Sequence, residues 1–217
     1  MRVSLCVLAL AVVAGGWLVG TPTAAGEKSE FLKPDNWVGL MEYWKIEGNT
    51  VTGTSPKEGL KFNTFLVSKQ KYGDFEFKCQ VRVRGEGSPN SGFQFRSMLD
   101  DMKKFGVRGP QADIGEGWWG SLYGERFSPK DGGPSGAIMK KAPDMVAKTI
   151  KKDDFNDYRL KVVGKHVTIT VNGVTAVDDD FPVMPETGVF AFQLHAGKFM
   201  EVVFRNIEFT DLSQAKQ

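Results

Sequence analysis

Residues 161–173 read KVVGKHVTITVNG, and this stretch decides the class of fold. Two runs of alternating apolar and polar residues flank Gly164-Lys165, a pattern that predicts a β-hairpin with a two-residue turn. Asn172-Gly173 is a second turn signal, and it leads into a third run, VTAVDD at 174–179. Three short strands joined by tight turns indicate an antiparallel sheet.

Similar runs recur along most of the chain. Alternating or β-branched and aromatic segments predict further strands at 63–69, 74–84, 91–97, 157–164, 187–197 and 200–212. No segment has a sustained helical period, and only PDMVAK at 143–148 predicts a short helical turn. Many short strands, glycine-rich turns and a single core predict an all-β protein, a jelly-roll β-sandwich.

The N-terminus predicts export. A basic start and a long apolar run are followed by small residues, which indicates a signal peptide over residues 1–25 and one domain over residues 26–217. An uncleaved membrane anchor is the alternative, because the apolar run is close to spanning length. We therefore expect a periplasmic or extracellular protein with no membrane span in the mature chain.

Charge and cysteine content argue against several classes of protein. The chain has 28 basic and 26 acidic residues and no basic stripe, so it lacks the charge pattern of a nucleic-acid-binding protein. Loss of the signal peptide removes Cys6, so Cys79 has no partner for an internal disulfide and is expected in the core. Two histidines and no closely paired cysteines argue against a structural zinc site.

The stretch PQADIGEGWWGSLYGE at 110–125 concentrates residues that could act on a sugar. In an extended strand Gln111 and Asp113 point to one side, and a bulge at Gly115 would turn Glu116 to that side too. The resulting pattern, Q-x-D-x-x-E, differs at one position from the E-x-D-x-x-E pattern of retaining β-sandwich glucanases, whose first glutamate is the nucleophile. The Gln111 amide cannot form a glycosyl ester, whereas an inverting mechanism through Asp113 and Glu116 stays open.

Aromatic residues follow in the same stretch. Trp118, Trp119 and Tyr123 could stack on sugar faces or donate to oxygen atoms, although packing in the core would account equally well for either tryptophan. Neighbouring residues of a strand face opposite ways, so we expect only one tryptophan to reach a site. Glu125 is a further candidate, and the irregular residues 126–152 predict a wall or lid of the cleft.

Two other strands carry candidate side chains. If Phe93 and Phe95 face the core, Gln94 and Arg96 face the surface that would hold the cleft. There Arg96 would offer a rigid fork of donors to a substrate oxygen, with a surface salt bridge as the alternative.

His195 ends an apolar strand and shares a face with Gln193. It could shuttle a proton, or it could be a structural histidine. With Asp113, Glu116 or Glu125 it could also hold a divalent metal ion, although no tight ligand spacing identifies such a site.

Several segments, taken in order, resemble the 3-keto-disaccharide hydrolase family, long known as a domain of unknown function in exported bacterial proteins. They are PNSGFQFRS, GPQADIGEGWWGSLYGE, FNDYRLKVVG, VNG, FQLHAG and VVFRNIEFTDL, which together cover nearly the whole mature chain. The resemblance implies a concanavalin- or LamG-like jelly roll. It also implies an exported hydrolase or lyase that acts on glycosides already oxidised to a ketone at C3.

A C3 ketone acidifies the proton on C2, and loss of that proton forms an enolate that can expel the group on C1 before water adds back. This route needs a base and donors to the enolate, but no carboxylate nucleophile, so an amide at Gln111 is compatible with it. We expect Asp113 as the general base, His195 as a proton shuttle, and Arg96 and Tyr123 as donors to the reacting oxygen.

The residues expected to bind substrate are Gln94, Gln111, Glu116, Trp118, Trp119, Glu125 and Gln193. Two other functions stay open, a non-catalytic carbohydrate-binding module of the same fold and an inverting glycosidase. Three polar residues receive structural interpretations: Asn90 as a turn residue, and Asn156 and Arg205 as residues that fix a strand end or a buried hydrogen bond.

Overall fold

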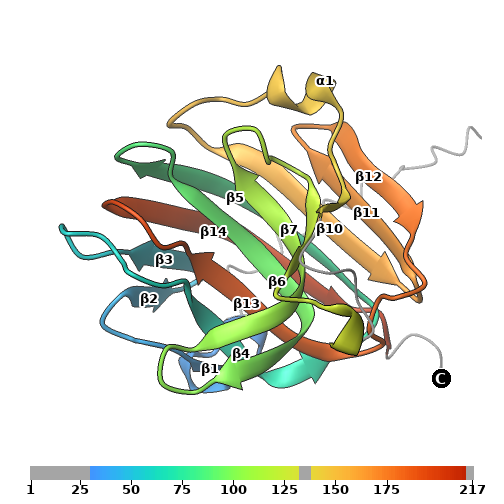
Figure 1. Cartoon of the computed structure of the whole chain (residues 1–217), viewed down its shortest axis with the longest axis horizontal. Helices are drawn as coiled ribbons and strands as arrows, with labels where there is room; N and C mark the ends of the chain where they lie inside the picture. The colour runs from blue at the N-terminus through green and yellow to red at the C-terminus, as the bar shows by residue number, and fades with distance from the viewer. Residues whose placement is uncertain (1–29, 132–137, 214–217) are drawn as a thin grey trace, which may run out of the picture.

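The computed structural model describes residues 30–131 and 138–213, so the predicted signal peptide lies outside the described part of the chain. The described residues form two antiparallel sheets that face each other across one hydrophobic core (Figure 1). This arrangement confirms the prediction of an all-β jelly-roll sandwich. None of the helices in these two ranges is long and apolar enough to cross a bilayer.

The first sheet carries most of the candidate residues. Its strands lie in the order β1 (Trp37–Val38), β4 (Thr64–Tyr72), β13 (Gly188–Leu194), β6 (Asn90–Asp101), β7 (Gly106–Gly115), β8 (Leu122–Glu125) and β9 (Ile138–Lys140). The second sheet has the order β12 (Val174–Asp180), β11 (His166–Val171), β10 (Asn156–Val163), β5 (Phe75–Gly85), β14 (Met200–Asp211), β3 (Thr50–Thr54) and β2 (Trp44–Glu47). The helical turns are η1 (Glu30–Leu32), η2 (Pro34–Asn36), η3 (Pro129–Asp131) and α1 (Asp144–Ala147).

The stretch that predicted the fold forms strands β10, β11 and β12. Val163 pairs with His166 across the Gly164-Lys165 turn, as the alternating pattern predicts. In the next turn Asn172 and Gly173 have φ values of 48° and 80°, the left-handed pair that a two-residue hairpin turn requires. The predicted helical turn is also present, as α1.

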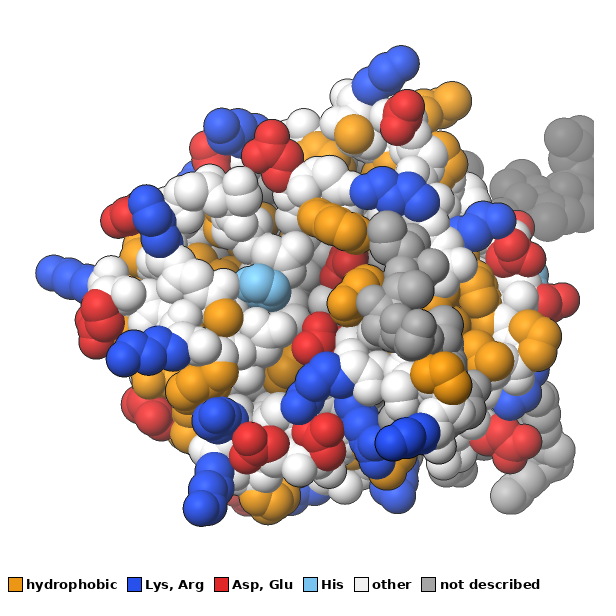
Figure 2. All heavy atoms as spheres, viewed as in Figure 1, with side chains coloured by type: hydrophobic (Ala, Val, Ile, Leu, Met, Phe, Trp, Pro, Cys, Tyr) orange, Lys and Arg blue, Asp and Glu red, His pale blue; other side chains and the backbone are white. Residues whose placement is uncertain are grey.

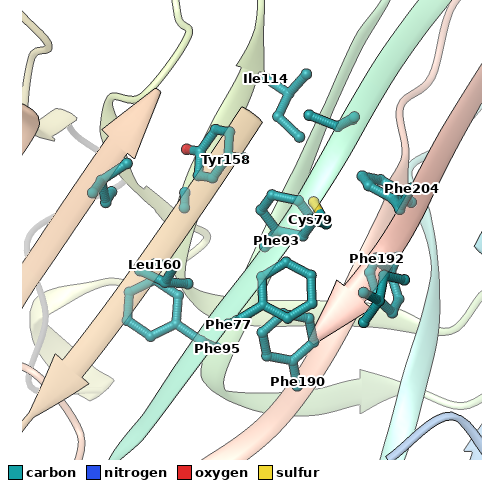
Figure 3. Packing of buried hydrophobic residues seen from close by; sticks show 14 of the residues in the cluster. Phe77, Cys79, Phe93, Phe95, Ile114, Tyr158, Leu160, Phe190, Phe192 and Phe204 are labelled. Atoms are coloured by element: carbon teal, nitrogen blue, oxygen red, sulfur yellow. The ribbon is translucent and has the colours of Figure 1, made fainter. Parts of the chain in front are cut away.

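Phenylalanine rings fill the space between the sheets (Figure 3). Phe93 on the first sheet contacts Phe77 and Phe204 on the second, with ring centroids 4.9 and 5.1 Å apart. Such offset aromatic pairs add to the stability that burial of the rings provides. Cys79 lies among them as a buried free thiol, as predicted.

Four strands were not predicted from the sequence. β1, β2 and β3 lie between residues 37 and 54 and contain only two, four and five residues. The three-residue β9 lies in the segment 126–152, which was predicted to be irregular. Such short segments hold too few residues to show the period-two alternation on which a strand prediction depends. They pair at the edges of sheets whose longer strands are already formed, so tertiary contacts decide their conformation.

The middle of the first sheet is buried on both faces. All seven residues of β13 are buried, and so are nine of the ten residues of β7. The inward residues pack in the core, whereas the outward ones include the polar side chains Gln94, Gln111, Asp113 and Gln193. A buried polar row on the outer face of a sheet needs internal partners, and these partners define the candidate site.

Candidate functional site

A cavity of about 340 Å³, here called the site pocket, opens on the outer face of the first sheet. Figure 2 shows the corresponding hollow, with a histidine at its edge and acidic side chains within it. Its lining is Ser88, Asn90, Gln111, Asp113, Glu116, Trp118, Tyr123, Glu125, Gln193 and His195. The fold therefore brings most of the predicted site residues into one hollow.

Strand register explains why these residues meet. In the antiparallel pairs, Gln111 on β7 lies opposite Gln94 on β6 and opposite Tyr123 on β8. Asp113 lies opposite Gly92, and Gln193 on β13 is one residue beyond the pair that links β13 to β6. Residues opposite one another share a face of the sheet, so side chains from four strands surround the pocket.

Gly92 leaves room for the Gln111 side chain. A Cβ atom at position 92 would lie 2.8 Å from Cδ of Gln111, closer than carbon atoms can approach without a shift. The absence of a side chain allows the Gln111 amide to lie across β6 toward Gln193, whose Oε1 is 3.4 Å from the Gln111 Nε2. The Gln111 side chain thus passes over Gly92 and connects β7 to β13.

A chain of buried hydrogen bonds runs under the pocket to Asp113. Ser97 Oγ donates to Gln94 Oε1 over 2.7 Å, and Gln94 Nε2 donates to Gln111 Oε1 over 2.8 Å. Gln111 Nε2 then donates to Asp113 Oδ1 over 2.5 Å. Each amide uses its oxygen as acceptor and its nitrogen as donor, so the chain orients Gln111 with its N–H toward the carboxyl group.

Burial changes the acidity of Asp113. The side chain is buried, and loss of hydration raises its pKa from 3.8 to about 7. The negative charge of Glu125 raises the pKa further, whereas the hydrogen bond from Gln111 and the charge of Lys141 lower it. A carboxyl group with a pKa near neutrality can accept and return a proton under ordinary conditions.

Two further groups in the pocket hold their protons more firmly than usual. Burial raises the pKa of Glu125, with opposing effects from Arg126 and His195 and from a hydrogen bond with Asn63. Burial and the charges of Glu125 and Asp113 also raise the pKa of Tyr123. The Tyr123 hydroxyl is therefore a donor at neutral pH.

One hydrogen bond sets the tautomer of His195. Its Nδ1 lies 2.6 Å from the carbonyl oxygen of Ala196, and a carbonyl only accepts, so Nδ1 carries the proton. In the neutral ring Nε2 is then an acceptor. Asn63, which the sequence analysis did not single out, accepts from Ala196 N over 2.8 Å and reaches Glu125 Oε1 over 3.5 Å. It thereby holds the His195 segment beside β8.

Gln193 contributes a buried donor. Its Nε2 is inaccessible to solvent and has no hydrogen-bond partner among residues 30–131 and 138–213. Its Oε1 faces the Gln111 donor, which fixes the amide so that the N–H groups are available for other acceptors. An unpaired buried donor in a pocket wall favours a ligand that brings an oxygen atom to that point.

Arg96 does not belong to the pocket, and its predicted role is wrong. Three steps along β6 match two along β13, because Val189 pairs with Ser97 and Ala191 with Gln94. The extra residue forms a bulge in which Arg96 has a φ of 45°. Ser97 takes the outward position, and the Arg96 side chain turns to the end of the sandwich.

At that end the Arg96 guanidinium is buried and fully engaged. Its Nη2 lies 2.8 Å from Asp74 Oδ1, and its other nitrogen atoms donate to the carbonyl oxygens of Gly73, Gly164 and Pro185. These partners lie in the turns between β4 and β5 and between β10 and β11, and in the loop before β13. Arg96 is a structural link between turns of the two sheets.

Three other predicted residues need a smaller correction. Gln94 lies beneath the pocket, where it orients Gln111 and does not line the cavity. Trp119 is a core residue and Trp118 lines the pocket, but residues 116–120 form a turn, so the turn and not strand alternation separates the two rings. Glu116 reaches the pocket through a tight turn after β7, in which the amides of Trp118 and Trp119 donate to Gly115 O, and not through a bulge.

Asn90 and Ser88 line the pocket but were not predicted as site residues. Their Pro and Gly neighbours favoured a turn, and only the pairing of Asn90 with Gly115 at the end of β7 places them at the site. Asn156 makes the expected structural contacts, because it is buried and bonds the backbone of Lys151. Arg205 is partly exposed: its guanidinium lies 3.5 Å from the Phe155 ring centroid, and its Nε donates to Gln80 Oε1 over 3.0 Å.

The carboxylates and His195 do not form the metal site that the sequence left open. In the described parts of the chain no group of three histidine, cysteine, aspartate or glutamate side chains is arranged to hold a metal ion. We therefore derive no step through a metal ion. Of the predicted wall, residues 141–152 border a neighbouring cavity and not the site pocket, and residues 132–137 lie outside the described part of the chain.

The two antiparallel sheets define a jelly-roll β-sandwich protein, a fold that several solved structures share. A candidate glycosyl hydrolase from Parabacteroides distasonis is 19% identical, with 82% of this chain and 94% of that chain covered and a TM-score of 0.54. The carbohydrate-binding module CBM66 from Bacillus subtilis is 16% identical, with coverages of 80% and 94% and a TM-score of 0.54. The VIP36 exoplasmic/lumenal domain is 14% identical, with coverages of 82% and 83% and a TM-score of 0.56.

The chain belongs to the family of 3-keto-alpha-glucoside-1,2-lyase-like domains, whose family model matches residues 26–210. This match confirms the family resemblance that the ordered segments indicated. No curated protein matches the chain. At identities of 14–19% the structural likenesses show the fold alone.

Proposed function

We propose that this protein breaks the C1–oxygen bond of 3-keto glycosides by elimination, followed by addition of water. One observation carries the proposal: Asp113 is a buried carboxyl group whose pKa is about 7, and an amide stands two residues before it. Gln111 cannot act as a glycosyl nucleophile, yet Asp113 is suited to proton transfer. A reaction that begins with proton abstraction next to a ketone uses what the pocket provides.

In the first half of the reaction ionised Asp113 takes the proton from C2, and the electron pair of the C2–H bond moves toward the C3 ketone. Gln193 Nε2 and the Tyr123 hydroxyl are the available donors to the developing enolate oxygen. They take the place of Arg96, which the sequence analysis assigned to this task. An oxygen atom placed there would also satisfy the buried Gln193 donor.

The enolate then expels the group on C1. The C1–O bond breaks, the leaving oxygen receives a proton, and an unsaturated ketone with a C1–C2 double bond remains. Glu125 is suited to donate that proton, because its raised pKa keeps more of it protonated near neutrality than an exposed glutamate.

Addition of water completes the reaction. Water attacks C1 with His195 Nε2 as the proton acceptor, and C2 recovers a proton from Asp113. The product is a free 3-keto sugar, so the overall change is hydrolysis, although the first half is a lyase reaction. Release of the unsaturated ketone before water adds would make the same site a lyase.

The direct test compares a 3-keto disaccharide with its unoxidised parent. We expect the purified protein to release sugar from the oxidised substrate only, because only its C2 proton is acidic. Release from both compounds would instead support an inverting glycosidase that uses Asp113 and Glu116. Deuterium at C2 distinguishes the two routes further, since elimination exchanges that atom with solvent and direct hydrolysis retains it.

Asp113→Asn and His195→Ala should each lower kcat/KM by at least ~100-fold, because each removes a proton-transfer group. In the wild type, kcat/KM should rise with pH through about 7, as Asp113 ionises, and Asp113→Asn should lose this dependence. Asp35→Asn and His166→Ala are matched controls outside the pocket lining and should keep wild-type rates. Full activity of both pocket variants would refute the assignment.

A non-catalytic carbohydrate-binding module is the second candidate. The partly exposed ring of Trp118 beside a polar pocket favours it, since aromatic faces stack on sugars, and one structure of similar fold is a carbohydrate-binding module. In that case the protein would bind a 3-keto disaccharide without turnover. Asp113→Asn would then change affinity modestly, with no catalytic pH dependence to lose.

A further inference from the structure

A second and larger cavity of about 590 Å³ lies directly beside the site pocket. The two cavities share Glu116 and Trp118, so the turn after β7 forms their common wall. Pockets that enclose small molecules range from about 300 to 1,000 Å³, which places the site pocket near the lower limit and its neighbour well within the range. The neighbouring cavity, here called the side pocket, has no role in the mechanism above.

Trp118 stands between the two cavities. Its ring makes an edge contact with Tyr123 of the site pocket, with centroids 6.5 Å apart at 75°. Lys141 from the side pocket lies over the same ring, with Nζ 4.4 Å from the centroid, and also donates to the carbonyl oxygen of Gly117. Trp118 is therefore held in place, while 37% of its surface stays exposed.

The lining of the side pocket has an apolar part and a charged part. Val83, Trp119, Pro143, Ala147 and Ile150 contribute to its wall. The charged residues in its lining, such as Lys152 and Asp153, are exposed to solvent.

The buried polar side chain in the same wall is already satisfied. Asn156 donates to the carbonyl oxygens of Lys151 and Asp154, and its own oxygen accepts from Lys151 N and from Asn172. The apolar part of the wall suits a flat apolar group, which needs no hydrogen-bond partner there.

We propose that the side pocket is the leaving-group subsite and that it selects 3-keto glycosides with a flat, largely apolar group on C1, such as an aromatic aglycone. The assignment rests on the proposed function. The oxidised ring would occupy the site pocket, and the C1 substituent would pass Trp118 into the side pocket. Both halves of the substrate would then lie against the same tryptophan.

The test compares benzyl and methyl 3-keto glucosides. Both release a primary alcohol of similar acidity, so a difference in kcat/KM reports recognition of the ring and not leaving-group chemistry. Burial of an aromatic ring predicts that the benzyl glycoside is favoured by about 10-fold or more. A 3-keto disaccharide is the third substrate and should be used less well than the benzyl glycoside.

Ala147→Trp provides the matched variant. Ala147 is an exposed residue at the end of α1 that lines the side pocket, so an indole there would fill the cavity without disturbing the core. The benzyl-to-methyl ratio of kcat/KM should fall toward one. Met145→Trp places the same ring on the same helix at a position outside both pocket linings and should keep the wild-type ratio.

Calorimetric binding to Asp113→Asn separates this inference from the proposed function. The benzyl 3-keto glucoside should bind about 10-fold or more tightly than the methyl compound, and Ala147→Trp should abolish the preference whether or not turnover occurs. Equal affinities, or a preference that survives Ala147→Trp, would overturn the leaving-group subsite. Failure of the wild type to turn over any 3-keto glycoside would overturn the proposed function, and the binding comparison would still decide the subsite.

Discussion

At the scale of single residues, the environment of Asp113 gives the pocket its chemistry. The carboxyl group is buried, yet its hydrogen bond comes from the neutral amide of Gln111 and not from a cation. A cationic partner would hold the pKa low and make Asp113 a permanent anion. An amide orients the carboxyl group while leaving burial to raise its pKa, so the residue at position 111 helps set the acidity of the residue at 113.

Asp113→Asn should stabilise the protein at high pH. Burial raises the pKa of Asp113 from 3.8 to about 7, so the folded protein retains a proton that the unfolded chain releases between these values. Wild-type stability therefore falls as pH rises through this window, while the neutral amide of the variant avoids the loss. Urea unfolding at about pH 8 should show the variant more stable by roughly 2–4 kcal/mol.

The gain in the free energy of unfolding of Asp113→Asn should shrink steadily as the pH is lowered toward about 4, because Asp113 of the wild type then becomes protonated in the unfolded chain as well as in the folded protein. Asp35→Asn makes the same chemical change at an exposed position outside the pocket and serves as the control. A difference between Asp113→Asn and wild type that did not vary with pH would contradict the raised pKa.

At the scale of elements, a single extra residue in β6 decides which side chains face the pocket. The bulge lets Ser97 follow Gln94 on the outer face and sends Arg96 to the turns at the end of the sandwich. Side chains on a strand alternate strictly, so one inserted residue exchanges the two faces for every position beyond it. The alternation Phe93-Gln94-Phe95-Arg96 contains no sign of this change.

Arg96→Ala should damage stability much more than catalysis. The variant would remove the buried guanidinium and leave three carbonyl acceptors and the Asp74 carboxylate without it, which should cost about 3–5 kcal/mol. Chemical denaturation measures this loss. Because Arg96 lies outside the pocket, kcat/KM of the folded variant should stay within about threefold of wild type.

Arg84→Ala is the comparison for Arg96→Ala, because Arg84 is exposed to solvent. It should lower the free energy of unfolding by well under half as much as Arg96→Ala. A large fall in kcat/KM with unchanged stability in Arg96→Ala would restore the catalytic role that the sequence suggested.

At the scale of the whole molecule, the N-terminal described segment completes the core. Phe31 of η1 stacks on Phe209 of the second sheet at 4.0 Å, and its edge meets Phe190 of the first sheet at 5.6 Å. The Trp37 indole in turn donates to the carbonyl oxygen of Phe31. A three-residue helical turn thereby joins the two sheets.

Phe31→Ala should lower the free energy of unfolding by about 3–5 kcal/mol, because the ring is buried between the sheets and the alanine variant leaves a cavity. The midpoint of denaturant unfolding measures the change. Phe31 lines neither pocket, so kcat/KM of the folded variant should match wild type. Phe62→Ala removes a partly exposed ring and should lower the free energy of unfolding markedly less. Equal losses for the two variants would contradict the role of η1 in joining the two sheets.

The sequence predicted the long strands, the two-residue turns and the shared face of Gln111 and Asp113. All of these depend on neighbours within a few positions, through period-two alternation and the conformational freedom of residues such as Gly173. The short strands β1, β2, β3 and β9 escaped prediction because pairing with other strands stabilises them. Asn90 and Asn63 escaped as well, because their contacts to the site come from strand pairing and loop packing.

By itself the sequence determined the class of fold, the family and the stretch that carries Gln111, Asp113 and Tyr123. Only the tertiary structure decided that Arg96 leaves the site, that Gln193 presents an unpaired donor and that Asp113 has a pKa of about 7. The physical reason is that alternation is local, whereas strand register, burial and hydration depend on segments far apart in the chain. The pKa of Asp113 and the hydrogen bonds of the pocket depend on residues of β6, β7, β8 and β13 together.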